Sequence, residues 1–250
     1  MTIVITGASG TLGRALTPLL AGEKGGVRAL SRKDRPAEPG VEWRRADLLT
    51  GEGLAAALDG ASAVVHCATD PRRPKSDVPA TRNLVEAARA QGDPHLIYVS
   101  IVGVEGHHYP YYRVKVACER LVAESGLPFT ILRATQFHDL LAMVFGYLVK
   151  VPLVMPVLAG IEDQPVDVSE VAARLVEIVG DGPQGLAPDL GGPEVLGFAD
   201  LARTYLEATG RKRLLVPVPL PGRIGRDFRR GLHLAPDHAA GGRTWREYLT

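Results

Sequence analysis

The chain has 250 residues, enough for one α/β domain or for one domain with a small extra lobe. Its formal net charge of +1 excludes a global positive field of the kind that attracts nucleic acid or an anionic membrane. Two cysteines without a C-x-x-C pair argue against a disulfide framework or a cysteine-based metal site. The N-terminus reads as a core strand without a basic n-region, so we expect no signal peptide and a cytoplasmic location. The most apolar stretch, residues 140–149, is too short to span a membrane.

A glycine-rich turn follows the first predicted strand. Residues 3–5 form a short β-branched run, which predicts a buried strand, and a helical pattern begins at Thr11. Strand, turn and helix in this order predict a phosphate site at the helix N-terminus. The alternative is an ordinary βα turn that holds three glycines. The residues expected at the phosphate site are Thr6, Gly7, Ser9, Gly10, Thr11, Leu12 and Gly13.

Strands and helices alternate through the first 135 residues. Strands are predicted at 27–30, 41–48, 63–67, 96–102 and 129–133, and helices at 54–58, 79–90 and 111–124. This order predicts an α/β fold with a doubly wound parallel Rossmann sheet and right-handed crossovers. Ligands bind such sheets beyond the carboxyl ends of the strands.

After Thr135 the alternation loosens and ten prolines interrupt the pattern. Helices are predicted at 137–148, at 168–179 with an acidic or hydroxyl N-cap offered by Asp167-Val-Ser-Glu, and at 198–208. No polar linker separates the two halves. We therefore expect residues 1–135 to form a dinucleotide-binding core. Residues 136–250 are expected to form a small mixed α/β substrate lobe packed on it, within one structural unit.

The end of the second predicted strand indicates which dinucleotide is bound. Proteins that prefer NAD usually carry an acidic residue here for the ribose 2′-hydroxyl, whereas this chain has Ser31, Arg32 and Lys33. A hydroxyl and a guanidinium suit a 2′-phosphate, so the sequence predicts a preference for NADP(H) over NAD(H). Arg14 can add to the same phosphate. The alternative is a solvated basic loop.

Tyr111 and Lys115 lie four residues apart in a predicted helix, on one face. A phenol has a pKa near ~10, and lowering it by ~3 units requires about 4 kcal/mol. An ammonium at ~4 Å supplies about that much at an effective dielectric constant of ~20. Lys115 can therefore prepare Tyr111 as a proton donor. The alternative is an ordinary amphipathic helix in which Lys115 pairs with Glu119.

Several further segments contribute to one pattern: ITGASGTLG at 5–13, Asp47-Leu48, Ala68, Thr81-Arg82-Asn83-Leu84, Tyr98-Val99-Ser100, Tyr111 with Lys115, SGLPFTILR at 125–133, QPVDV at 164–168 and GGPE at 191–194. With them, the chain resembles an atypical short-chain dehydrogenase/reductase of the NmrA-like kind. The resemblance implies that Asp47 and Leu48 flank the adenine. It also implies that Lys115 holds the nicotinamide ribose. The remaining implied cofactor contacts are Cys67, Ala68 and Thr69 on the ribose and nicotinamide side, and Ala134, Thr135 and Phe137 over the nicotinamide.

The chain departs from this family at the end of the fifth predicted strand. Reductases of the family usually place a Ser or Thr where Ile101 and Val102 stand. Ser100 is the remaining hydroxyl there and is the candidate third catalytic residue beside Tyr111 and Lys115. Its alternative role is that of a strand residue bonded to the backbone.

Three function classes follow. The first is an NADP(H)-dependent reductase of a carbonyl or enone in an apolar small molecule, with the proton from Tyr111. The second is a non-catalytic NADP(H) redox sensor that binds a protein partner. The third is an isomerase, an epimerase or a polyketide-tailoring enzyme that keeps its cofactor bound. We expect a monomer or homodimer, no nucleic acid, no membrane and no metal, with His107 and His108 as solvent-exposed loop residues.

Overall fold

The computed structural model describes residues 2–22 and 26–250. The chain divides into two compact units, each made of several stretches. Unit 1 comprises Met1–Ser100, Pro110–Leu132 and Val171–Ala187, and unit 2 comprises Ile101–Tyr109, Arg133–Glu170 and Pro188–Thr250. A segment after strand five thus groups with the C-terminal half, and most of one late helix groups with the N-terminal half.

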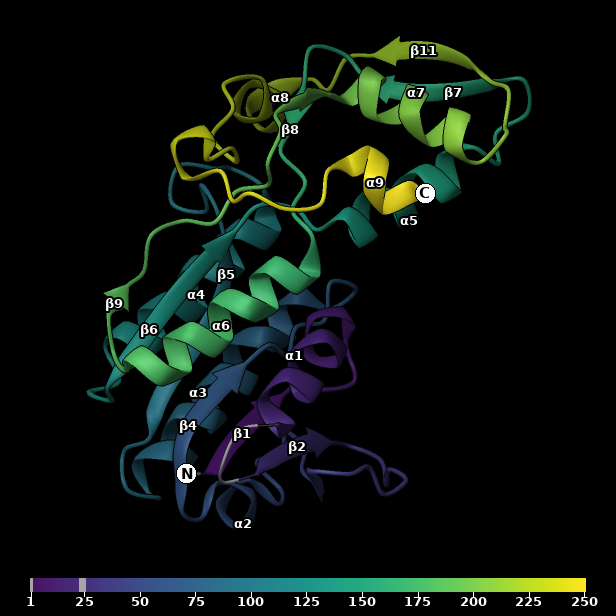
Figure 1. Cartoon of the computed structure of the whole chain (residues 1–250). Coiled ribbons are helices and arrows are strands. Elements are labelled where there is room, and N and C mark those ends of the chain that lie inside the picture. The colour runs from purple at the N-terminus through teal and green to yellow at the C-terminus, as the bar shows by residue number, and fades with distance from the viewer. Residues whose placement is uncertain (1, 23–25) are drawn as a thin grey trace. The chain divides into compact units, whose positions relative to one another are not determined.

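A seven-stranded parallel sheet forms the centre of the fold (Figure 1). Its order is β3 (Val41–Arg45), β2 (Val27–Ser31), β1 (Thr2–Thr6), β4 (Ala61–His66), β5 (His95–Ile101), β6 (Phe129–Ala134) and β9 (Gly185–Leu186). β1 lies inside the sheet between β2 and β4, with Ile5 opposite Ala29 of β2 and Val65 of β4. The predicted α/β doubly wound Rossmann sheet is confirmed, with β9 as an edge strand that the sequence pattern did not indicate.

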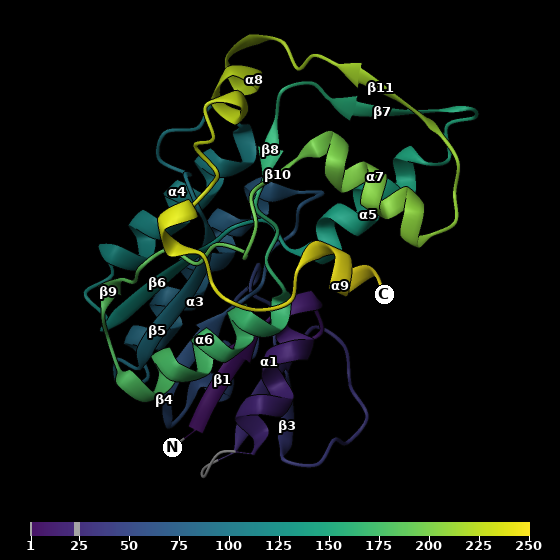
Figure 2. The same ribbon diagram turned by 45° about the horizontal axis from the view of Figure 1, so that its top comes forward.

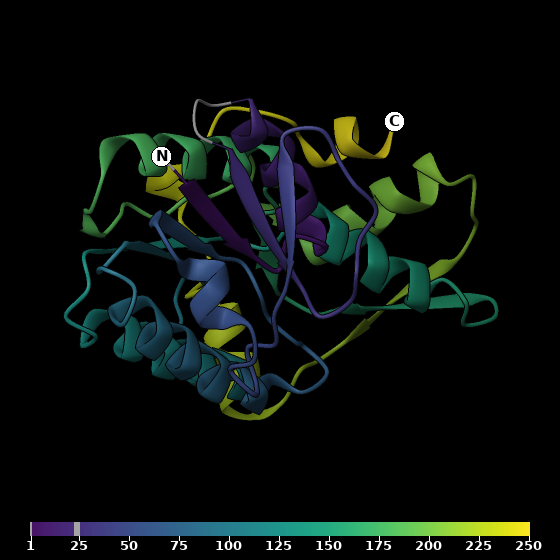
Figure 3. The ribbon, with the colours of Figure 1, turned by 90° about the horizontal axis from the view of Figure 1, so that it is seen from below.

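Helices cover both faces of this sheet in unit 1. One face carries α1 (Thr11–Ala21) and the unit 1 part of α6 (Val168–Asp181), and the other carries α2 (Leu54–Leu58), α3 (Asp77–Arg89) and α4 (Pro110–Ala123) (Figure 3). A 3₁₀ turn, η1 (Pro74–Ser76), precedes α3. Val64, Leu84 and Cys118 are fully buried between the sheet and the α2–α4 face. Apolar residues at helical spacing on α3 and α4 therefore form a core with the β-branched residues of the strands.

Unit 2 contains two small sheets. β7 (Val154–Leu158) pairs in parallel with β11 (Leu214–Val218), and β8 (Glu162–Asp163) pairs antiparallel with β10 (Leu196–Gly197). Its helices are α5 (His138–Leu148), α7 (Phe198–Ala208), α8 (Gly222–Arg229) and α9 (Trp245–Leu249), with the 3₁₀ turn η2 (Pro236–His238) (Figure 2). α5, α7, β7 and α9 share a core in which Phe145 is fully buried and the Trp245 indole donates a hydrogen bond to the Leu201 carbonyl at 3.0 Å.

The predicted cap of α6 is confirmed. Asp167 Oδ1 accepts hydrogen bonds from the Ser169 backbone N–H at 2.8 Å and from the Ser169 hydroxyl at 2.7 Å. These bonds satisfy one of the amide groups that a helix leaves open at its first turn. Among the described residues, no helix is long and apolar enough to cross a membrane.

Asp163 is a buried carboxyl in β8, and burial raises its pKa to about 7. Its folded-state pKa thus lies above its unfolded value, so its contribution to stability is full below about pH 4 and is lost as the pH rises toward 7. We expect Asp163→Asn to raise the midpoint of thermal unfolding at pH 8 by several degrees and to change it little at pH 4. The amide oxygen can still accept the bond from the Gln164 N–H, which is 2.9 Å from Asp163 Oδ1. Scanning calorimetry at the two pH values measures the difference, and an equal effect at both would contradict it.

Candidate functional site

The glycine turn joins β1 to α1 by close backbone packing. Gly7 has φ +68°, and a Cβ there would lie 2.7 Å from the Ala68 nitrogen at the end of β4. A Cβ on Gly13 would lie 2.3 Å from the Gly7 carbonyl oxygen and 2.5 Å from Ala8 Cα. Backbone atoms cannot move aside as a side chain can, so both positions require glycine. The turn is thereby held against the first helical turn and the end of the neighbouring strand.

The N-terminus of α1 is open for an anion. Its N-cap, Gly10, is in an extended conformation, no described side chain caps the helix, and its first turn has no acidic residue. Ser9 and Gly10 are exposed, whereas Leu12 and Gly13 are buried on the helix side. The uncapped N–H groups and the positive end of the helix dipole therefore suit a diphosphate. Arg14 is exposed one position past the last glycine.

Thr6 anchors the start of this turn through a buried polar chain. Its hydroxyl lies 2.7 Å from His66 Nδ1, and His66 Nε2 lies 3.1 Å from the Thr81 hydroxyl on α3. Burial, with a smaller effect from the charge of Lys115, lowers the pKa of His66 to about 3, so the ring is neutral. A neutral imidazole can donate at one nitrogen and accept at the other, which fits both threonines.

The end of β2 presents three cationic side chains close together in sequence. Ser31 is buried, and its hydroxyl accepts bonds from the Lys33 N–H at 3.1 Å and from Arg35 Nε at 3.3 Å. The Arg35 guanidinium lies 5.6 Å from the centre of the Trp43 ring. Arg32 is exposed. Ser31 thus fixes the conformation of the loop. Arg35 was not among the residues predicted to contact the cofactor.

The ends of β3 and β4 fix the predicted adenine and ribose residues. Asp47 Oδ1 accepts a bond from the Leu49 N–H at 2.8 Å, and the Asn83 amide on α3 donates to the Leu48 carbonyl at 2.8 Å. At the end of β4, the Ala68 N–H donates to the Thr6 hydroxyl at 3.4 Å. Burial raises the pKa of the Cys67 thiol to about 12, so this thiol is neutral. Its predicted role is to line the cofactor site without a charge.

Tyr111, at the start of α4, meets the loop after β4. Its hydroxyl lies 2.8 Å from the Thr69 hydroxyl, and Thr69 in turn donates to Asp77 Oδ2 at 2.5 Å. Asp77 is buried at the start of α3, whereas Thr69 is exposed and Tyr111 is half-buried. The phenol therefore stands at the surface of unit 1 while its hydrogen-bonded neighbours lead inward to a carboxylate. Asp77 was missed by the sequence analysis, although an acidic residue at a helix start is a visible signal.

Lys115 is buried one helical turn after Tyr111. Its ammonium donates to the Tyr98 hydroxyl at 3.0 Å and to the Val99 carbonyl at 2.8 Å, and it lies 4.5 Å from the centre of the Tyr98 ring. Burial lowers the pKa of Lys115, and burial raises the pKa of Tyr98 well above its ordinary value. The two bonds hold the ammonium against β5 and account for two of its three N–H groups.

Ser100 sits near the end of β5 with a buried hydroxyl. Among the described residues, its oxygen has no hydrogen-bond partner. An unsatisfied buried hydroxyl costs about 1–3 kcal/mol, which a bound ligand can recover. The alternative expectation, a bond from Ser100 to the backbone, is not found in this part of the chain.

Three predicted cofactor residues lie in unit 2. Ala134 forms a parallel bridge with Leu190, and the Thr135 hydroxyl accepts a bond from the Gly192 N–H at 3.2 Å. Phe137 is the N-cap residue of α5 and forms a parallel bridge with Val166. Unit 2 therefore brings these three residues onto one continuous segment that is held by backbone bonds.

His107 and His108 were both predicted to be solvent-exposed, and the prediction is wrong for one of them. His107 is buried, with its ring 4.4 Å from that of Phe228, so the expectation of a solvent-exposed side chain is wrong for it. His108 is partly exposed, and its Nδ1 lies 2.7 Å from Asp227 Oδ2 on α8. Phe228 of α8 covers the His107 ring, and no local sequence pattern links the two residues. Among the described residues, no group of three or more His, Cys, Asp or Glu is placed to hold a metal.

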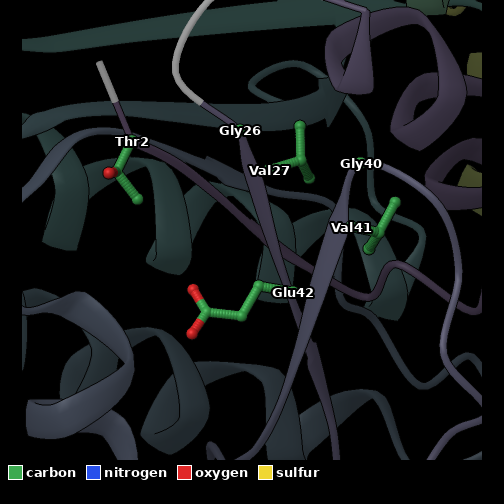
Figure 4. A pocket seen from close by; sticks show the side chains of 6 residues that line it. All are labelled: Thr2, Gly26, Val27, Gly40, Val41 and Glu42. Carbon is green, nitrogen blue, oxygen red and sulfur yellow. The ribbon is translucent and has the colours of Figure 1, made fainter.

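A shallow pocket of about 490 Å³ opens at the other end of the sheet (Figure 4). It is lined by Thr2, Gly26, Val27, Gly40, Val41 and Glu42, at the amino ends of β1, β2 and β3. Glu42, its charged residue, is already paired with Arg28 at 3.0 Å. Ligands of doubly wound sheets bind at the carboxyl ends, so this pocket is not the candidate site.

A glycine turn against an uncapped helix, at the carboxyl end of a central parallel strand, defines a dinucleotide-binding α/β protein. The sequence matches, over residues 7–179, the family model described as NAD(P)H-binding. The chain belongs to this family.

Three relatives illustrate the range of this similarity. The photosystem II assembly factor Ycf39 of Cyanophora paradoxa is 33% identical over 149 residues, which cover 56% of this chain and 46% of the relative. Quinone oxidoreductase 2 of Escherichia coli is 22% identical over 84% of this chain and 75% of its own. Its NADPH-bound crystal structure superposes with a TM-score of 0.81 at 20% identity, covering 99% and 98% of the two chains.

A nucleoside-diphosphate-sugar epimerase from Staphylococcus aureus superposes with a TM-score of 0.79 at 21% identity, covering 100% of this chain and 99% of that one. These structural likenesses show the fold. The chain spans less than half of the first curated relative, so the activity of that whole protein is not carried over.

Proposed function

We propose that this chain is an NADP(H)-dependent oxidoreductase that reduces a carbonyl or enone of an apolar small molecule, with Tyr111 as the proton donor. The observation that carries the proposal is the Tyr111 hydroxyl, half-buried at the surface of unit 1 and 2.8 Å from a second hydroxyl, on the helix that also buries Lys115. A sensor that only binds a cofactor has no use for a phenol placed in this way. The family supports the dinucleotide, and the phenol supports the chemistry.

The residues of unit 1 fit a dinucleotide. The uncapped start of α1 suits the diphosphate, Asp47 and Leu48 suit the adenine, and the buried orphan hydroxyl of Ser100 suits a ligand that brings a donor or acceptor. When bound, the reduced nicotinamide supplies the hydride. The third N–H of Lys115 is proposed to hold the nicotinamide ribose. The assignment of Ala134, Thr135 and Phe137 to the nicotinamide is likewise a proposal.

The preference for NADP(H) is proposed to depend on Arg32. We expect Arg32→Ala to weaken NADPH binding about tenfold to a hundredfold, which corresponds to the loss of 1–3 kcal/mol for a charge-assisted contact. NADH lacks the 2′-phosphate, so its affinity should stay nearly unchanged. Titration of both cofactors by fluorescence measures the two dissociation constants. NADH and NADPH that bind the native chain equally well would refute this role of Arg32.

Arg35 provides a matched control for the same experiment. Its guanidinium is already engaged with Ser31 and lies over Trp43, so Arg35→Ala should loosen the loop without removing the proposed phosphate contact. It should weaken NADPH and NADH together. A selective loss of NADPH in Arg35→Ala would instead assign the phosphate contact to Arg35.

A second candidate function is a non-catalytic NADP(H) sensor that binds a protein partner. The relative named as a photosystem II assembly factor favours it, as do Ile101 and Val102 in the place of the usual hydroxyl. An epimerase-like enzyme is the third candidate, favoured by one structural neighbour. NADPH oxidation over a panel of quinones, enones and ketones separates these classes. Oxidation of NADPH supports the reductase, and product formation without net oxidation supports the epimerase class. The absence of both oxidation and product supports the sensor.

A further inference from the structure

The protons in the Tyr111–Thr69–Asp77 cluster can be assigned from its hydrogen bonds. The Asp77 carboxylate is an acceptor, so the Thr69 hydroxyl donates to Asp77 Oδ2 at 2.5 Å. A hydroxyl has one hydrogen to donate, and the hydrogen of Thr69 is used in this bond. At the 2.8 Å contact with Tyr111, Thr69 therefore accepts and the phenol donates. All protons in the chain point inward, from the phenol to the carboxylate.

Asp77 is held in place for this role. Its Oδ1 accepts a bond from the Asp70 N–H at 3.0 Å, and the side chain is 6% exposed. The titratable groups with which it interacts are Tyr98 on β5 and Lys115 and Cys118 on α4. The buried ammonium of Lys115 balances the charge of the carboxylate. A carboxylate kept inside the protein, two hydrogen bonds from an accessible phenol, is suited to receive a proton.

On the basis of the proposed function, we infer that Thr69 and Asp77 are positioning residues that form a proton path from Tyr111, with Asp77 as its terminal acceptor. In the direction of alcohol oxidation, the substrate hydroxyl loses its proton to the Tyr111 oxygen. The Tyr111 proton moves to the Thr69 oxygen, and the Thr69 proton moves to Asp77 Oδ2. The substrate carbon gives up its hydride to the oxidised nicotinamide, so atoms and electrons balance.

The same path runs backward during carbonyl reduction and then starts from protonated Asp77. Thr69 also supplies Tyr111 with the neighbouring hydroxyl that Ile101 and Val102 do not. The path thus gives the proposed site a route for the Tyr111 proton that the sequence motifs do not contain.

Three variants and a control test this inference. Thr69→Val removes the hydroxyl at nearly constant shape, Thr69→Ser restores it, and Asp77→Asn removes the acceptor charge. Ser76→Ala is the matched control, because it deletes a 2.7 Å loop bond to the Arg73 carbonyl beside Asp77 but outside the path. Each variant is measured for NADPH affinity, for kcat and KM in both directions, and for the pH profile of kcat.

The path predicts that Thr69→Val lowers kcat about tenfold or more with little change in NADPH affinity, and that Thr69→Ser recovers most of it. Asp77→Asn should lower kcat in both directions, because the path ends at this carboxylate during oxidation and starts from it during reduction. Ser76→Ala should leave kcat unchanged. Full activity in Thr69→Val, or equal losses in Ser76→Ala and Asp77→Asn, would overturn the inference.

A readout without turnover separates this inference from the proposed function. In protein with ¹³C-labelled tyrosine, the Tyr111 ring-carbon signal is the one that disappears in Tyr111→Phe. It should shift in Thr69→Val, where the phenol loses its acceptor, and return toward the native position in Thr69→Ser. An unmoved signal in Thr69→Val would overturn the path. If the Tyr111 signal shifts in Thr69→Val but the native chain turns over no substrate, the hydrogen-bonded path stands and only the proposed function is wrong.

Discussion

Tyr111→Phe is expected to abolish turnover while the chain still binds NADPH. The substitution removes one oxygen, and with it the proton donor and the bond to Thr69. General acid catalysis contributes typically 10²–10⁴-fold, so kcat should fall by about that factor. The glycine turn and the start of α1 are untouched, so the dissociation constant for NADPH should change less than about twofold. Steady-state kinetics with the best substrate of the panel and a cofactor titration give both values.

Tyr112→Phe is the matched control for this prediction. Tyr112 follows Tyr111 on α4, but its side chain is 2% exposed and belongs to the interior of unit 1. Loss of its hydroxyl should cost some stability and leave kcat close to the native value. If Tyr111→Phe retains full activity, the proton comes from another group and the proposed mechanism is wrong.

Gly13→Ala is expected to eliminate NADPH binding. The added methyl group would lie 2.3 Å from the Gly7 carbonyl oxygen and 2.5 Å from Ala8 Cα, so the turn and α1 must separate. Such overpacking costs typically 1–3 kcal/mol of stability. Because the open N–H groups of α1 lose their arrangement, NADPH affinity should fall by about a hundredfold or more. Thermal unfolding and cofactor titration measure the two effects.

Gly180→Ala tests whether this loss is specific to the turn. Gly180 lies in α6 of unit 1, and a Cβ there would meet no atom within 4 Å. Alanine stabilises a helix interior relative to glycine by about 1 kcal/mol, so this variant should be slightly more stable and bind NADPH normally. A Gly13→Ala chain that binds NADPH as the native chain does would show that the turn does not hold the diphosphate.

Most of the unit 1 fold could be predicted from the sequence because its signals are local, and the helix 54–58 was predicted with the bounds of α2. In unit 2, the helix 198–208 was predicted with the bounds of α7. β7 and β11 were missed because Pro156 and Pro217 lie inside them, and proline normally argues against a strand. In a two-stranded sheet each strand has a free edge, so a missing N–H is tolerated there.

The candidate site was only partly predictable. The glycine turn, Tyr111 and Lys115 have fixed spacings that a sequence pattern can contain. The link from Tyr111 to Asp77 spans 34 residues and depends on how the loop after β4 folds back to α3, which no local spacing records. The prediction that Lys115 acts on Tyr111 stays a prediction, and two bonds of the Lys115 ammonium go to Tyr98 and Val99.

The contacts of Lys115 indicate what it contributes to the candidate site. The buried ammonium is hydrogen-bonded to β5, and its charge interacts with those of Cys118, Asp77 and Glu119. Burial lowers its pKa, and the nearby Cys118 and Asp77 act against that shift. Lys115 and Asp77 are therefore expected to depend on each other.

The proposed function requires that hydride leaves a cofactor held by this chain. The most direct measurement uses NADPH that carries deuterium at its transferable position, with the native chain and an enone or ketone that supports NADPH oxidation. Mass spectrometry of the product should show one deuterium per molecule bound to carbon, and none with Tyr111→Phe. Tight NADPH binding without deuterium in any product of the panel would contradict the proposed reductase function.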